Sequence, residues 1–335
     1  ASSGGSSSTV DNSDLGSVNT PLNHLSSAFD LIATKGDTII MMEGTHSGSN
    51  NRGINLNGNK SFVLMGDPNS TPDKVIIDAG GRDKHFTFDN NEDTTTQIIG
   101  LTLYNGEHTN GWGGGSIYIN NGAVKLKNVI FKGNHSTSND GYSAGAVFAY
   151  NFGATTIENC TFDGNYILHD DGSGMGGAIA AMGQNNDSDT LRIINSTFKY
   201  NYVKTKYQGQ GGAMVLWHSQ AVIENNLFHD NYVYAGLDAS SNQNAFSGGV
   251  SIYNPNYWDN NARTSRALTV LFSNNTVANN YVTSEDNQSW MEGPAMRING
   301  GDVGLIVSFN NLIWGNKIIG RETSRQVYID IWNDE

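Results

Sequence analysis

The sequence predicts an all-β fold: a single right-handed parallel β-helix of about eight coils, with three strands per coil. Two observations carry this prediction. A pair of motifs recurs six times, and each repeat holds three short runs in which hydrophobic and polar residues alternate. Strands separated by such tight corners cannot pair within one coil. Each is therefore expected to pair with its equivalent in the next coil, about 4.8 Å along the axis.

The first motif places a hydrophobic residue between two asparagines. It is NCTFDGN at 159–165, NSTFKYN at 195–201, NNLFHDN at 225–231 and NNLIWGN at 310–316. Equivalent positions stack in a β-helix, which predicts an internal column of Phe131, Phe162, Phe198 and Phe228, continued by Val277 and Ile313. The asparagines are expected at the corners, where Asn tolerates left-handed backbone angles and its amide can bond the Asn of neighbouring coils.

The second motif is a glycine-containing corner that precedes each first motif. It is GGSI at 114, AGAV at 144, GGAI at 176, GGAM at 211, GGVS at 248 and GPAM at 293. A strand follows the glycines rather than a helix, which excludes a phosphate-binding loop. Glycine is expected where a side chain would clash or φ must be positive. The single cysteine, Cys160, occupies a repeat position and is expected to be a small inward residue.

The two ends of the chain differ. Residues 1–19 form a Ser/Gly-rich segment, predicted to be flexible, and 20–335 form the β-helix domain. Leu25 and Phe29 lie on one apolar stripe between Pro21 and Gly36, which predicts a capping helix at about 21–33. At the other end QVYIDIW still has the pattern of a strand, so the last coil is expected to lack a cap, or to be closed by something outside it in a longer chain.

Composition limits the classes of partner. The formal net charge of −13 and the absence of a basic cluster exclude a nucleic-acid phosphate backbone as partner. No apolar run reaches the roughly 18 residues needed to cross a bilayer, so the chain is not expected to span a membrane. With one cysteine there is no internal disulfide to indicate the compartment.

The pairing of GGA plus a hydrophobe with FxxN resembles the repeat of polymorphic outer-membrane-protein passenger domains. It is also similar to the wider class of secreted right-handed parallel β-helix proteins, over roughly residues 20–335. The resemblance implies an extracellular or cell-surface location. It is weak for activity, because the same scaffold carries adhesins, polysaccharide lyases, glycosidases and epimerases.

Alternation in the strand after each glycine corner separates inward from outward residues. The outward residues of successive coils are largely aromatic, and we expect them to contact a sugar ring or an apolar partner. The candidate binding residues are Tyr118, Phe148, Tyr150, Trp217 and Tyr253, with Met182 in the same column. The alternative is that the long segments after each FxxN fold back and cover this column.

Catalytic and metal candidates are weaker. His169, Asp170 and Asp171 could form a carboxylate site, but adjacent acids in a polar loop are more often solvated. A lyase would need a basic residue, for which Lys204, Lys206, Arg263, Arg266 and Arg297 are present without a distinctive spacing. No cofactor is expected. Ca²⁺ at DNNED (89–93) or NNDSD (185–189) is the alternative, although neither segment matches a full ligand loop.

The leading hypothesis is therefore a non-catalytic extracellular protein. It would recognise a polysaccharide, or a cell-surface glycan or protein, through the outward aromatic column and adjoining loops. The first alternative is a polysaccharide lyase or glycoside hydrolase on the same scaffold. The second is a structural stalk or surface-layer element with no ligand.

Overall fold

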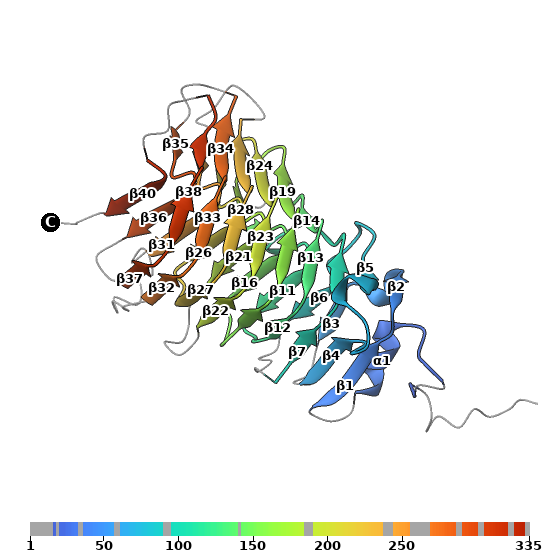
Figure 1. Cartoon of the computed structure of the whole chain (residues 1–335). Coiled ribbons are helices and arrows are strands. Elements are labelled where there is room, and N and C mark those ends of the chain that lie inside the picture. The colour runs from blue at the N-terminus through green and yellow to red at the C-terminus, as the bar shows by residue number, and fades with distance from the viewer. Residues whose placement is uncertain are drawn as a thin grey trace, which may run out of the picture.

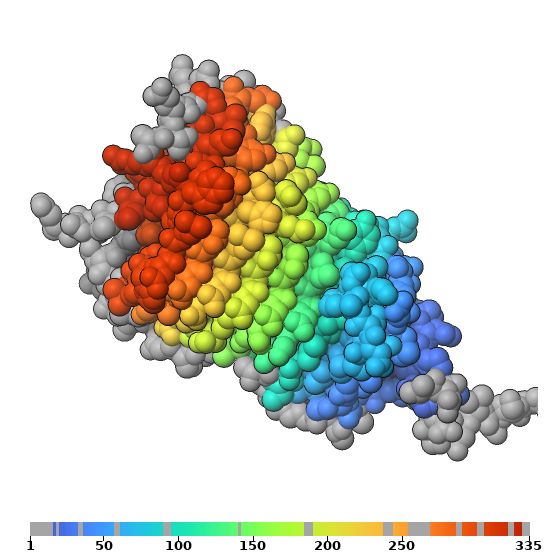
Figure 2. Space-filling view, viewed as in Figure 1, coloured from blue at the N-terminus to red at the C-terminus, as the bar shows by residue number. Residues whose placement is uncertain are grey.

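The computed structural model describes residues 16–17, 20–32, 36–56, 61–89, 95–139, 142–183, 190–236, 244–254, 269–285, 290–300, 305–320 and 325–331. The described chain winds into a parallel β-helix whose coils follow one another from the N-terminal to the C-terminal end (Figure 1). Figure 2 shows the coils as successive bands of colour. Three sheets of nine strands each run the length of the molecule, close to the predicted number of coils.

These three sheets, named A, B and C in the order in which the chain visits them, are parallel throughout. Sheet A contains β1 (Asp37–Met41), β4 (Phe62–Gly66), β7 (Gln97–Ile99), β12 (Lys125–Lys127), β17 (Thr156–Glu158), β22 (Leu191–Ile194), β27 (Ala221–Glu224), β32 (Thr269–Ser273) and β37 (Leu305–Phe309). Sheet B contains β2 (Gly44–Ser47), β5 (Val75–Asp78), β8 (Thr102–Tyr104), β13 (Ile130–Lys132), β18 (Thr161–Asp163), β23 (Thr197–Lys199), β28 (Leu227–His229), β33 (Thr276–Ala278) and β38 (Leu312–Trp314). Sheet C contains β3 (Ile54–Leu56), β6 (Phe86–Phe88), β11 (Ile117–Asn120), β16 (Val147–Tyr150), β21 (Ile179–Met182), β26 (Met214–Trp217), β31 (Val250–Asn254), β36 (Met296–Gly300) and β40 (Val327–Ile331).

Most coils contain more than the three predicted strands, which corrects the prediction. The segments after the FxxN asparagines were expected to be loops, but their first residues alternate and pair as a fourth sheet, sheet D. Sheet D contains β9 (Glu107–His108), β14 (His135–Ser136), β19 (Tyr166–His169), β24 (Tyr202–Thr205), β29 (Tyr232–Ala235), β34 (Tyr281–Ser284) and β39 (Lys317–Ile318). Several of these strands form a row along the upper edge of the molecule in Figure 1.

From sheet D the chain returns through short strands that lie between sheets D and C. Sheet F contains β10 (Gly113–Gly114) and β15 (Ser143–Ala144), and sheet E contains β20 (Gly174–Met175), β25 (Gln208–Gln210), β30 (Asn244–Phe246) and β35 (Trp290–Glu292). The inward residues of sheet D and two residues of sheet E make a small apolar core separate from the main one. Sheets D and E thus form a second, outer layer beside the coil.

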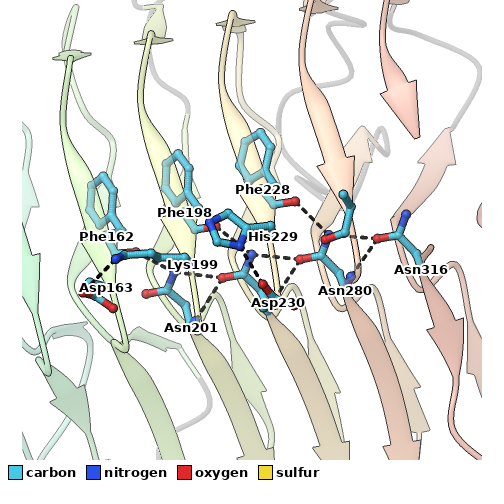
Figure 3. Close-up of polar contacts among 12 residues, drawn as sticks. Phe162, Asp163, Phe198, Lys199, Asn201, Phe228, His229, Asp230, Asn280 and Asn316 are labelled. Atoms are coloured by element: carbon cyan, nitrogen blue, oxygen red, sulfur yellow. Dashed lines mark hydrogen bonds and ion pairs between the residues drawn. The ribbon is translucent and has the colours of Figure 1, made fainter. Parts of the chain in front are cut away.

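A column of identical side chains runs through the main core. Phe131, Phe162, Phe198 and Phe228 are completely buried, and their rings lie parallel with centroids 4.6–4.7 Å apart. Figure 3 shows three of these rings. Val277 and Ile313 continue the column in register. The predicted internal column is confirmed.

The two asparagines of the first motif have different roles. The first asparagine of each copy adopts left-handed backbone angles, with φ of 53–57°, at the corner from sheet A to sheet B; these are Asn128, Asn159, Asn195, Asn225, Asn274 and Asn310. The last asparagine is buried and forms a continuous ladder of Asn134, Asn165, Asn201, Asn231, Asn280 and Asn316. Short polar side chains can take left-handed angles, and stacked amides satisfy one another where the backbone turns.

Each rung of the ladder is bonded on both sides (Figure 3). The side-chain oxygen of Asn201 accepts from the backbone N–H and the side-chain amide of Asn165, at 3.0 Å each. Its own amide donates to the Phe162 carbonyl and to the side-chain oxygen of Asn231. A shorter second ladder begins at Cys160, whose backbone N–H donates to Ser196 Oγ. Cys160 is buried, which raises the pKa of its thiol to about 12.

The glycine corners bring neighbouring coils into close contact. A Cβ on Gly145 would lie 1.9 Å from the carbonyl oxygen of Gly177 and 2.6 Å from the backbone nitrogen of Tyr166. A side chain at Gly145 would therefore push away both the glycine corner of the next coil and the neighbouring strand of sheet D. Gly176 and Gly211 also have positive φ. Both expectations for the second motif, close approach and positive φ, are met.

Helix α1 (Leu25–Leu31) covers the first coil but is shorter than the predicted 21–33. Leu25 and Phe29 are buried, and the Phe29 ring packs edge-on against Phe62. The side chain of Asn51 accepts from the backbone N–H of Leu25 at 2.8 Å, so the coil itself supplies the helix cap at that residue. Two 3₁₀ turns, η2 (Ser49–Asn51) and η3 (Pro72–Lys74), complete the described helices.

The last coil carries apolar side chains at the surface. Ile306, Ile313 and Val327 are only partly buried against the core. Leu312 and Trp314, on the outward side of β38, are more than half exposed. The strand predicted in QVYIDIW is present as β40.

We expect Asn201→Ala to lower the free energy of unfolding by about 3 kcal/mol, because buried donors and acceptors on both neighbouring rungs lose a partner. Chemical denaturation followed by circular dichroism measures this. Asn110→Ala, at an exposed position, is the control and should change stability by less than about 0.5 kcal/mol. Equal effects of the two substitutions would contradict a stabilising ladder.

Candidate functional site

The outward face of sheet C carries two rows of side chains, fixed by the parallel register. The first row, along the side nearer the glycine corners, runs through Tyr118, Phe148, Ala180, Val215, Ser251 and Arg297. The second row runs through Asn120, Tyr150, Met182, Trp217, Tyr253 and Asn299. The assignment of outward residues from alternation is correct for every residue predicted to bind.

Sheets E and F cover the first row. Phe148 is completely buried in a cluster with Ala144, Met175, Ala180 and Val215. The prediction that Phe148 contacts a ligand is therefore wrong: the returning strands pack on its ring. For this first row, the chain segments that follow each FxxN motif do cover the outward side chains. Tyr118 is the exception, because it is only partly buried.

The second row stays partly exposed and gains two aromatic neighbours. The centroid of the Trp112 ring lies 5.0 Å from the ring centroids of both Tyr142 and Tyr150, with interplanar angles of 57° and 84°. The ring centroid of Tyr142 is also 5.8 Å from that of Trp217, and the centroids of Trp217 and Tyr253 are 5.7 Å apart. We call Trp112, Tyr142, Tyr150, Trp217 and Tyr253 the aromatic stripe. Its rings are inclined to one another, so parts of their faces remain open to a flat ligand.

Sequence reasoning missed Trp112 and Tyr142. They lie in the connections before the corners, outside the strands to which alternation applies. The sequence did contain a signal: each of these aromatic residues directly precedes a pair of small residues, Gly113–Gly114 (β10) or Ser143–Ala144 (β15). An aromatic residue beside these small residues can lie flat over the sheet that the chain is about to enter.

Arg297 lies at one end of the stripe, next to Tyr253. Its guanidinium lies 3.9 Å from the centroid of the Phe246 ring and donates to the Tyr253 hydroxyl. Its Nε is 3.7 Å from Glu292 Oε2, and the residue is only 5% exposed. The positive charge of Arg297 is thus largely balanced within the protein. It holds Tyr253 in place and leaves little charge for a ligand.

A second aromatic array lies on sheet D, in segments that we expected to be loops. Tyr166, Tyr202, Tyr232 and Tyr281 stack with ring centroids 4.8–4.9 Å apart and interplanar angles of 2–8°. The His135 ring extends the stack by 4.9 Å beyond Tyr166. All five point outward, because the residues that alternate with them are buried.

The environment of these tyrosines raises the pKa of their phenols. Desolvation by the neighbouring rings, together with the charge of adjacent phenolates, raises the pKa of Tyr202 and Tyr232 to about 12. The same causes of burial and nearby negative charge raise the pKa of Tyr166 and Tyr281.

The carboxylate candidates do not assemble. His169 is buried, with Nδ1 2.8 Å from the Ser173 carbonyl, and so points away from solvent. Asp171 accepts from Lys206 Nζ at 3.2 Å and from the Tyr207 hydroxyl at 3.1 Å, contacts that lower its pKa. Lys206 is therefore engaged in an ion pair with the exposed Asp171, whereas the side chain of His169 is buried.

The remaining chemical candidates give no site in the described part of the chain. Residues 90–93 of the first Ca²⁺ candidate, all of the second (185–189), and Arg263 and Arg266 lie outside the described residues. Within the described ranges no group of three His, Cys, Asp or Glu side chains is placed to hold a metal ion. No described helix has the length and apolar character needed to cross a membrane.

No protein-family model, curated protein or solved structure matches the chain. Function is therefore inferred from the geometry of the two aromatic faces.

Stability should fall as the pH rises from 10 towards 12. In that interval an unfolded tyrosine has lost its proton, whereas folded Tyr202 and Tyr232 keep theirs; the unfolded state binds fewer protons and is favoured by alkali. Denaturant unfolding at several alkaline pH values measures the slope, and tyrosinate absorbance follows the ionisation. Tyr202→Phe should reduce the slope. Ionisation of all tyrosines near pH 10 would contradict the stacked environment.

Proposed function

We propose that the protein is a non-catalytic extracellular or cell-surface β-helix that recognises a glycan through the aromatic stripe. The observation that carries the proposal is the row of inclined, partly exposed rings of Trp112, Tyr142, Tyr150, Trp217 and Tyr253 on a rigid sheet. Exposed aromatic faces offer flat apolar surfaces on which the apolar faces of sugar rings can stack.

Rigidity supports this role. The backbone of each stripe strand is paired on both sides along sheet C, and its inward residues are completely or almost completely buried. The rings are therefore positioned before a ligand arrives, and binding loses little conformational entropy. The stripe extends over several coils, which suits an extended chain of sugars better than a single small molecule.

Charge supports a neutral ligand. Arg297 is the one cation on the described outward rows of sheet C, and Glu292 accompanies it. The carboxylate of Asp89 accepts from Asn120 at the opposite end of the second row. With a net charge of −13 on the chain, an acidic polysaccharide would be repelled.

We expect Trp217→Ala and Tyr150→Ala each to weaken binding of a neutral polysaccharide about tenfold or more, because each removes a stacking face worth roughly 1.4 kcal/mol. Affinity gel electrophoresis against a panel of neutral and acidic polysaccharides measures retention. Tyr104→Ala is the matched control: Tyr104 is an exposed tyrosine on sheet B, outside the stripe.

Thermal unfolding of each variant separates loss of binding from loss of fold. Retention unchanged by both stripe substitutions would end this proposal. Release of reducing ends or of unsaturated products from the same panel would favour a polysaccharide-degrading enzyme instead.

A further inference from the structure

We propose that sheet D carries a second glycan-binding face, which holds an extended neutral polysaccharide along the axis of the β-helix by hydrogen bonds to a row of tyrosine hydroxyls. We call Tyr166, Tyr202, Tyr232 and Tyr281 the hydroxyl row. This face is separate from the aromatic stripe and contacts its ligand differently.

The geometry of the row exposes ring edges rather than ring faces. Each ring lies parallel to the next at 4.8–4.9 Å, so the faces cover one another. Sugar rings therefore cannot stack on the row. The alternating residues Ile167, Val203, Val233 and Val282 are completely buried beneath it and fix its position. What remains outward is a line of phenol hydroxyls repeated once per coil.

These hydroxyls have no role in holding the fold together. No described residue forms a hydrogen bond with any of the four, and none of the four is a buried atom without a partner, so all reach solvent. Neighbouring tyrosines differ: Tyr234 donates to Glu285, and Tyr207 donates to Asp171. Phenylalanine at the four positions would stack equally well, so the hydroxyls add a polar pattern that packing does not require.

The pattern limits the ligand. A repeat of one hydroxyl per coil is matched by a polymer that offers a polar group at similar intervals, and a single small molecule would use only one or two hydroxyls. Phenols are uncharged at neutral pH, so each hydroxyl of the row can both donate and accept, as sugar hydroxyls also do.

The charged residues beside the row favour a neutral polymer. Glu107 and His135 lie together at one end, with 3.7 Å between Oε1 and Nε2. Lys317 continues the row at the other end, and Lys204 in the adjacent row lies over the Tyr234 ring. These mixed charges give the described face of sheet D no cluster of cations for a polyanion.

The test is the double variant Tyr202→Phe/Tyr232→Phe, which removes two hydroxyls and keeps the stacked rings. Retention on linear neutral polysaccharides, chiefly glucan, mannan and xylan, is measured by affinity gel electrophoresis. Loss of two hydrogen bonds to the ligand predicts a decrease in affinity of about tenfold or more. Tyr104→Phe, which removes an exposed hydroxyl from sheet B, should have no effect.

The outcomes separate this site from the stripe. A decrease in the double variant that is also seen in a Trp217→Ala background establishes an independent second face. Wild-type retention in the double variant overturns the hydroxyl row, and loss on Trp217→Ala alone would then leave recognition at the stripe. Salt-sensitive preference for a polyuronate, or self-association through the row without glycan retention, would also overturn it.

Discussion

The stacking of like side chains along the axis is the constraint on which the rest of this structure depends. A corner in the main chain leaves backbone groups that the β-ladders do not reach, and here the buried asparagines satisfy them. Each inner asparagine of the ladder bonds an asparagine on either side, as Asn201 does with Asn165 and Asn231. The ladder thereby joins successive coils at the corner where each sheet B strand, with its inward phenylalanine, ends and each sheet D strand, with its outward tyrosine, begins.

The same register produces two aromatic faces of different chemistry. On sheet C the outward residues vary from coil to coil, and the rings of Trp217 and Tyr253 incline to fit one another. On sheet D the residue at one position is repeated, and identical rings such as Tyr202 and Tyr232 stack in parallel. The varied residues of sheet C thus expose ring faces, whereas the repeated tyrosines of sheet D cover one another's faces and expose their hydroxyls.

Local pattern was enough to predict the coil but not the layer outside it. The phenylalanine column and the asparagine corners follow from residues at fixed offsets, so Phe162 and Asn165 could be placed from the sequence. The strand at Tyr166 has only four residues and follows directly on a turn, and so it resembles the start of a loop. Whether an outward residue is covered depends on where distant segments return. Alternation correctly put Phe148 on the outer face but could not show that Ala144 and Met175 pack over it.

The ladder also tolerates large differences in coil length. Successive ladder asparagines are separated by 30 residues between Asn201 and Asn231 and by 49 between Asn231 and Asn280, yet the hydrogen bonds are the same at both steps. Residues can therefore be inserted between two ladder asparagines without disturbing the stack. The stack itself can be lengthened or shortened only by a complete coil. Duplicating one coil would therefore lengthen both outer surfaces by one step, so the length of the two aromatic faces can change only in whole coils.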